Sequence, residues 1–237
     1  MHGLNRILIV TAVAAERDAL LAGRQPADGR LGELAAHRCR TGAGLVDVIC
    51  GGVGAVPAAL STAHALAQPP AGYRLVIAAG IGGGFGPAEP GSVVLADAVV
   101  HADLGAETAD GGFSPLSELG WGEVRFDLDP ELTAELAGRA GARTGAVLTV
   151  STVTGTQARA DALRAAHPDA LAEAMEGSGV YQAAARAGLP FAELRAISNR
   201  VGPRDRDHWQ LAEALAALGE AFDRILARPL RSPGAAP

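Results

Sequence analysis

The sequence predicts an α/β protein, a three-layer α/β/α sandwich in which helices cover both faces of a central sheet. Two observations predict this class. Apolar β-type runs alternate along the chain with Ala-rich helical stretches, which is the pattern of β-α units. The strands are also continuous apolar runs, and strands of that kind are covered on both faces. We therefore expect one domain over residues 1–227 and a flexible C-terminal tail over residues 228–237.

The elements follow from local patterns in chain order. Arg6–Val13 is an apolar run that predicts a buried strand, and Ala14–Gly23 predicts a short helix that ends at a glycine. A second strand is expected at Val46–Gly51. The later strands are expected at Leu75–Ala79, Ser92–Val100, Ala146–Val150 and Phe191–Ile197, and the later helices at Pro57–Ala67, Pro130–Ala140, Gln157–Ala166, Ser178–Gly188 and Trp209–Ala227. The polar, Gly-rich segment Leu104–Gly122 predicts a long excursion, or flap.

Composition excludes several classes of function. The chain has 237 residues, a formal net charge of −6 and no lysine, so a lysine Schiff base and a P-loop lysine are impossible. The acidic balance argues against nucleic-acid binding, and the absence of a long apolar run argues against a membrane span. Two cysteines, Cys39 and Cys50, indicate the reducing cytoplasm. Six scattered histidines give no metal-ligand spacing, so we expect no metal.

Residues that could carry chemistry follow the expected strands. Ligands of open α/β sheets bind at the carboxyl ends of strands. The residues expected at that edge are Glu16, Gly52–Gly54, Gly82–Gly84, Glu176, Ser198 and Asn199. Two carboxylates, an amide and glycine-lined backbone would therefore meet in one place.

Each of these residues also has a purely structural interpretation. Glu16 could be a solvated acid in the first turn of a helix, where the helix dipole favours it. The glycines could form tight turns, and Asn199 could be an ordinary turn residue. Glu176 lies among small and apolar residues, and a partly buried acid there requires a partner.

Taken together, the motifs resemble the superfamily of nucleoside phosphorylases and methylthioadenosine/S-adenosylhomocysteine nucleosidases. The resemblance extends from Arg6 to Ala227, and its most specific parts are Met175-Glu176-Gly177 and Arg195-Ala196-Ile197-Ser198. Within the superfamily, Ser198–Arg206, Thr152–Thr156 and Asp103–Glu107 are similar to the futalosine hydrolase family, which releases hypoxanthine from futalosine in menaquinone biosynthesis. The resemblance implies a central mixed sheet, a homodimer or larger homo-oligomer, and no cofactor.

The resemblance also implies roles for individual residues. The glutamate matching Glu16 activates the attacking water, and the one matching Glu176 binds the ribose 2′- and 3′-hydroxyls. The remaining positions expected to contact the substrate are Met175 and Ser198, with Gly82, Gly83, Val153 and Thr154 at the base. This set fits the chemistry, because breaking a ribosyl C–N bond places positive charge on the sugar and negative charge on the leaving base.

Asn199 departs from the pattern of the adenine-releasing nucleosidases, which usually have an aspartate there. An amide NH₂ can donate to N7 and O6 of a 6-oxopurine, whereas a protonated carboxyl suits the acceptor and donor of adenine. Hypoxanthine is therefore the expected base, although a flipped amide could offer its oxygen instead. A second departure is Ala174, where many relatives carry another acid, so any role of that acid is missing or moved.

The 5′ side of the substrate is less defined. Futalosine carries a benzoate there, and guanidinium groups pair well with carboxylates. Arg200, Arg204 and Arg206 are candidates, although the alternating charges around them could also form a self-neutralised surface loop. Trp209 and Phe113 could stack on an aromatic ring or belong to the core.

The expected partner is a small purine nucleoside. We expect water as the nucleophile, because Arg17 is the only arginine in the Glu16 loop and Glu16 would repel phosphate. Two alternatives stay open at this point. One is a methylthioadenosine/S-adenosylhomocysteine nucleosidase or another purine nucleosidase. The other is a nucleoside-binding module that has lost the chemistry.

Overall fold

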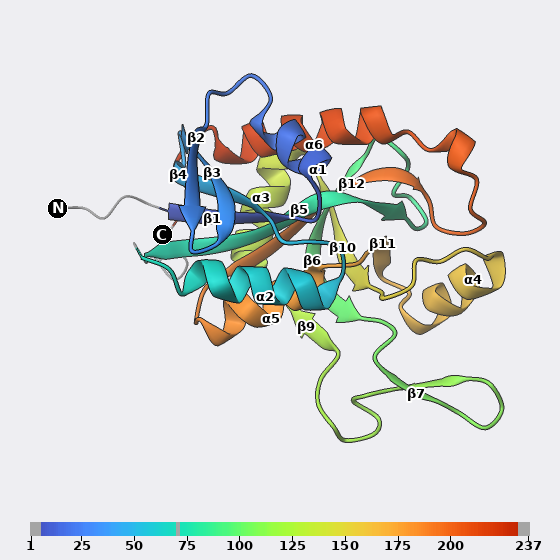
Figure 1. The fold of residues 1–237 in the computed structure, drawn as a ribbon. Coiled ribbons are helices and arrows are strands. Elements are labelled where there is room, and N and C mark those ends of the chain that lie inside the picture. The colour runs from blue at the N-terminus through green and yellow to red at the C-terminus, as the bar shows by residue number, and fades with distance from the viewer. Residues whose placement is uncertain (1–5, 70–71, 232–237) are drawn as a thin grey trace.

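The computed structural model describes residues 6–69 and 72–231 (Figure 1). Ten described strands join one sheet in the order β11-β10-β6-β12-β5-β1-β4-β3-β2, with β9 beside β6. Their bounds are β1 Arg6–Thr11, β2 Ala27–Leu31, β3 Leu34–Thr41, β4 Gly44–Cys50, β5 Tyr73–Gly84, β6 Val93–His101, β9 Arg125–Asp127, β10 Arg143–Thr149, β11 Ala170–Ala174 and β12 Phe191–Arg200. β1, β4, β5 and β12 run parallel, whereas β12 pairs antiparallel with β6. The expected mixed sheet is therefore confirmed.

Helices cover both faces of this sheet (Figure 1). They are α1 Ala14–Leu21, α2 Ala55–Leu66, α3 Pro130–Ala140, α4 Gln157–Ala166, α5 Gly177–Arg186 and α6 Leu211–Leu226. Leu20, Leu136 and Leu218 bury α1, α3 and α6 against one face, and Ala58 and Val180 bury α2 and α5 against the other. The three-layer prediction is thus confirmed. No described helix combines the length and the apolar character needed to cross a membrane.

Several strands were not expected from the sequence. β2 and β3 form the polar edge of the sheet, where the exposed Ala27–Arg30 lacks the apolar pattern of a buried strand. β11 has the sequence ALAEA, which has helical propensity, yet it is buried between β10 and the end of β5. Within the expected flap, β7 (Gly105–Glu107) pairs with β8 (Phe113–Pro115) to form a small separate hairpin.

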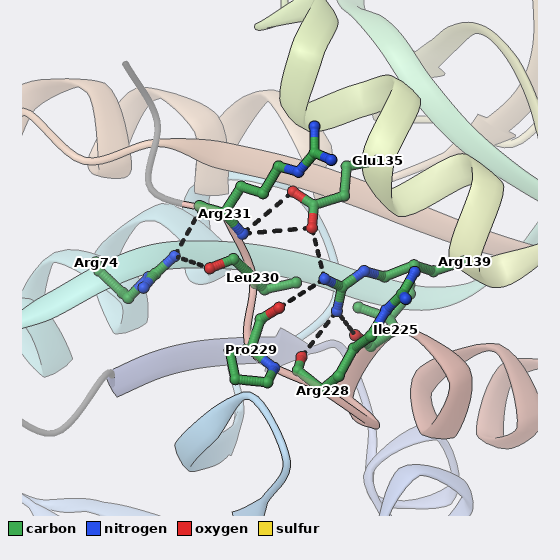
Figure 2. Close-up of polar contacts among 8 residues, drawn as sticks. All are labelled: Arg74, Glu135, Arg139, Ile225, Arg228, Pro229, Leu230 and Arg231. Carbon is green, nitrogen blue, oxygen red and sulfur yellow. Dashed lines mark hydrogen bonds and ion pairs between the residues drawn. The ribbon is translucent and has the colours of Figure 1, made fainter. Parts of the chain in front are cut away.

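The start of the expected flexible tail is held by specific bonds (Figure 2). The Arg139 guanidinium donates to the carbonyls of Ile225, Arg228 and Pro229 at 2.9, 2.8 and 2.6 Å, and it pairs with Glu135 at 2.5 Å. Arg74 donates to the carbonyls of Leu230 and Arg231 at 3.1 and 2.9 Å. These bonds connect residues 228–231 to β5 and α3, residues 232–237 lie outside the described residues, and the flexibility of the tail stays a prediction.

Candidate active site

One cavity of about 220 Å³ opens at the carboxyl ends of the sheet strands. Residues at or just after the ends of β1, β5, β11 and β12 form most of its wall, which places it where an α/β sheet binds its ligands. Its lining includes Glu16, Gly82, Gly83, Val153, Thr154, Met175, Glu176, Ser198, Asn199 and Arg204. Ten of the eleven residues predicted for the site are therefore in one place, and Arg206 is the exception.

Glu16 is buried at the start of α1, with 3% of its surface exposed. Oε2 accepts the backbone N–H groups of Ala12 and Val13 at 2.8 and 3.2 Å, and Oε1 accepts that of Ile81 at 2.9 Å. The bond from Ile81 ties the first turn of α1 to β5. Glu16 is thus a fixed cavity carboxylate, and its interpretation as a solvated helix acid was wrong.

Glu176 lies in the connection between β11 and α5, immediately before α5, and is 7% exposed. Its Oε1 accepts the backbone N–H of Gly54, in the glycine turn that follows β4, at 3.1 Å. Its Oε2 forms an ion pair with Nη1 of Arg195 at 3.2 Å. The partner that a buried acid requires is therefore present, and it comes from a residue for which the sequence suggested no role.

Arg195 is the central cation of the site. It lies in the middle of β12 with 1% of its surface exposed, and its Nε donates to Oε1 of Glu193 at 2.8 Å. Burial opposes its charge, but the carboxylates of Glu193, Glu176 and Glu16 outweigh burial and raise the pKa of the guanidinium. Burial also raises the pKa of Glu193, against the opposing pull of Arg195. An arginine inside an apolar strand was the signal in the sequence that could have revealed this network.

Gly80 explains how Glu16 and Arg195 come together. A Cβ at position 80 would lie 2.4 Å from Oε1 of Glu16 and 2.8 Å from Nη1 of Arg195. Both groups therefore pack over the same point of β5, which only a glycine leaves open. The site consequently holds three carboxylates around one guanidinium, and their net negative charge suits a cationic sugar.

Asn199 lies near the end of β12 and faces the same cavity. Its Nδ2 donates to the carbonyl of Arg200 at 2.9 Å, and its Oδ1 accepts the hydroxyl of Ser198 at 2.8 Å. A carbonyl can only accept, so the contact with Arg200 identifies the nitrogen of the amide and fixes its orientation. The amide keeps a second N–H with which to donate to a ligand.

The expected 5′ residues separate into two groups. Arg204 and Trp209 line the cavity, and the guanidinium of Arg204 lies 5.6 Å from the centre of the Trp209 ring. Arg206 contacts the same ring at 5.6 Å but is absent from the cavity wall. Arg200 instead pairs with the exposed Glu89, and Phe113 lies exposed in β8. No residue of the expected flap belongs to the cavity lining, although every residue of the flap is described.

The described residues of the site include no cluster of side chains suited to bind a metal ion. Among residues 6–69 and 72–231, no group of three or more His, Cys, Asp or Glu side chains is arranged to hold a metal ion. Cys39 and Cys50 are both unpaired. The arrangement can instead hold a neutral, hydroxyl-rich ligand between two buried carboxylates, with amide donors at one end and a guanidinium at the other.

Comparison with known proteins agrees with this geometry. A family model described as "Phosphorylase superfamily" matches residues 6–231. The chain is 53% identical to the futalosine hydrolase of Streptomyces coelicolor, over 92% of this chain and 94% of the relative. It is 49% identical to that of Acidothermus cellulolyticus, over 91% and 88%. The chain therefore belongs to the phosphorylase superfamily and, within it, to the futalosine hydrolase family.

Solved structures show the same fold. The native futalosine hydrolase of Helicobacter pylori superposes with a TM-score of 0.80 at 18% identity, covering 95% of this chain and 98% of that one. An S-adenosylhomocysteine nucleosidase from Streptococcus pyogenes, bound to 5-methylthiotubericidin, superposes with a TM-score of 0.80 at 24% identity, covering 95% and 97%. At these identities the likeness establishes the fold, and the residues of the cavity must carry any further argument.

Proposed function

We propose that the chain hydrolyses the N-glycosidic bond of futalosine and releases hypoxanthine and dehypoxanthine futalosine, a step of menaquinone biosynthesis. The observation that carries the proposal is the placement of two buried carboxylates, Glu16 and Glu176, in one cavity with the Asn199 amide. The curated relatives at 53% and 49% identity, both named futalosine hydrolase, support it.

The chemistry divides among these groups. Glu16 activates the water that attacks the anomeric carbon, and Glu176 binds the ribose 2′- and 3′-hydroxyls. The transition state carries positive charge on the sugar, and Glu16 and Glu176, which line the cavity, stabilise that charge. Asn199 donates to N7 or O6 of the departing hypoxanthine. Arg204 and Trp209 contact the benzoate on the 5′ side.

Water is favoured over phosphate as the nucleophile. Arg195 is engaged by Glu193 and Glu176 and is absent from the cavity lining, where Arg204 is the only arginine among the described residues. A phosphorylase needs several donors that converge on its anion, while here the neighbouring carboxylates would repel one. The same cavity argues against a binding module that has lost its chemistry, since both acids are held in place.

The direct test is product analysis by mass after incubation with futalosine, inosine and methylthioadenosine, each in water labelled with heavy oxygen. We expect hypoxanthine from futalosine, the heavy label on the freed anomeric hydroxyl, and a rate that phosphate does not change. The isosteric variant Glu16→Gln should lose turnover, and its melting temperature is measured alongside because the glutamine NH₂ faces a backbone N–H in either orientation. Formation of a sugar 1-phosphate, or release of adenine in preference to hypoxanthine, would contradict the proposal.

A cytoplasmic location and assembly into a homodimer or larger oligomer remain predictions. Two unpaired cysteines support the first. Exposed apolar side chains at the beginning of α2, Val56 and Leu60, support the second. Size-exclusion chromatography with light scattering measures the oligomeric state directly.

A further inference from the structure

A third carboxylate faces the cavity and has no role in the chemistry described above. Glu173, in β11, is 6% exposed and lines the cavity. It belongs to neither the Glu16 site nor the Arg195 network. Among the described residues no arginine or histidine forms an ion pair with it; Thr154 supplies its hydrogen bonds, and burial raises the pKa of the carboxyl against the opposing charge of Arg159. Holding an acid in that state costs stability, which suggests that a ligand uses it.

The position of Glu173 is set by the topology of the sheet. The end of β5 lies between β11 and β12, and Gly83 is paired with Glu173 on one side and with Asn199 on the other. Across two strand spacings the backbones at positions 173 and 199 are about 10 Å apart. Glu173 and Asn199 thus belong to one row of the sheet, on either side of Gly83, and both line the cavity proposed for the base.

The contacts of Glu173 determine which groups it offers to that base. Oε1 accepts the backbone N–H of Thr154 at 2.8 Å, and Oε2 accepts the hydroxyl of the same residue. Thr154 is itself buried and lines the cavity. The backbone N–H and the hydroxyl of Thr154 are consequently both occupied. A ligand on this side of the cavity therefore meets the carboxylate oxygens of Glu173, which are acceptors, in place of an N–H donor.

Hypoxanthine and adenine differ in the groups that they present to a hydrogen-bond acceptor such as the Glu173 carboxylate. Hypoxanthine carries a donor at N1 and an acceptor at O6, whereas adenine carries an acceptor at N1 and a donor on its exocyclic amine. We propose that Glu173 is a specificity-determining residue that accepts the N1–H of a 6-oxopurine while Asn199 donates at N7 or O6. The inference deepens the proposed function and depends on it. An adenine in the same pose would turn its N1 lone pair toward a buried carboxylate, a mismatch that such sites penalise strongly.

The test compares substrates that differ only at the 6-position, futalosine with its 6-amino analogue and inosine with adenosine. The variant is Glu173→Gln, whose amide can donate to N1 of adenine. We expect kcat/KM for the 6-oxo substrates to fall and the preference for 6-oxo over 6-amino to shrink by about 100-fold. Glu33→Gln, an exposed glutamate between β2 and β3, serves as the matched control and should leave the preference unchanged.

The outcome separates this inference from a structural role and from the proposed function. If Glu173 only supports the backbone at Thr154, the variant should lower kcat/KM for both bases equally, and an unchanged preference would overturn the proposal. Should the glutamine variant not fold, Glu173→Asp keeps the charge, withdraws the oxygens by one methylene and is expected to reduce the preference as well. A wild-type enzyme that hydrolyses none of the substrates would refute the proposed function instead.

Discussion

The substitution Gly80→Ala tests whether Glu16 must stay where the structure holds it. The added Cβ would lie 2.4 Å from Oε1 of Glu16 and 2.8 Å from Nη1 of Arg195, whereas ordinary van der Waals contact begins at 3.4 Å. Glu16 must therefore move by about 1 Å. Because Gly80 does not have a positive φ, the backbone itself accepts alanine, and the perturbation is confined to the two side chains.

The expected loss follows from this displacement. A misplacement of about 1 Å in a catalytic group can cost about 100-fold in rate. We therefore expect kcat for futalosine to fall by about that factor in Gly80→Ala, with a smaller change in KM. The assay is the steady-state release of hypoxanthine, together with the melting temperature of each variant.

A matched Gly→Ala control lies in helix α3. A Cβ at Gly138 would meet nothing within 4 Å, and alanine is favoured over glycine inside helices by about 0.5–1 kcal/mol. Gly138→Ala should keep full activity and melt at the same or a higher temperature. Full activity in a correctly folded Gly80→Ala enzyme would refute the reasoning, because Glu16 would then not need its present position.

Three further predictions concern other parts of the molecule. Asn199→Asp should shift the kcat/KM preference from hypoxanthine toward adenine nucleosides by about tenfold, and an unmoved ratio would show that Asn199 does not contact the base. Arg204→Gln should raise KM for futalosine about tenfold but leave inosine unchanged, since inosine lacks the carboxylate. Arg139→Met removes the donors to three C-terminal carbonyls and should lower the free energy of unfolding by about 2 kcal/mol, measured by urea denaturation, without changing kcat.

The sequence predicted the features that follow from local chemistry. Glu16 and Asn199 were found because polar residues placed after buried apolar runs must lie at one edge of the sheet. The main strands and helices were found for the same reason, since apolar periodicity is a property of each segment alone.

The missed features depend on contacts between distant segments. The role of Arg195 requires Gly80 to leave space over β5 and requires Glu176 to approach from the start of α5. Neither is visible in the local sequence of β12. Glu173 was missed because the sequence ALAEA gives no sign of a buried strand, and its strand is recognisable only from its pairing with β5 and β10.

The pH dependence of base preference distinguishes an ionised Glu173 from a neutral one. Burial raises the pKa of Glu173, and the bonds from Thr154, together with the charge of Arg159, oppose that shift, while Asp103 adds to it. Above this raised pKa the ionised carboxylate offers acceptors alone, which suits the N1–H of hypoxanthine. As the pH falls through that pKa, the protonated carboxyl becomes a donor that suits N1 of adenine. The ratio of kcat/KM for the 6-oxo substrate to kcat/KM for the 6-amino substrate should therefore decline on acidification. Any effect of pH on Glu16 cancels in this ratio, because both substrates need Glu16. In Glu173→Gln the ratio should not depend on pH, and a wild-type ratio that stays constant as the enzyme is acidified would contradict a role for this carboxylate at the base.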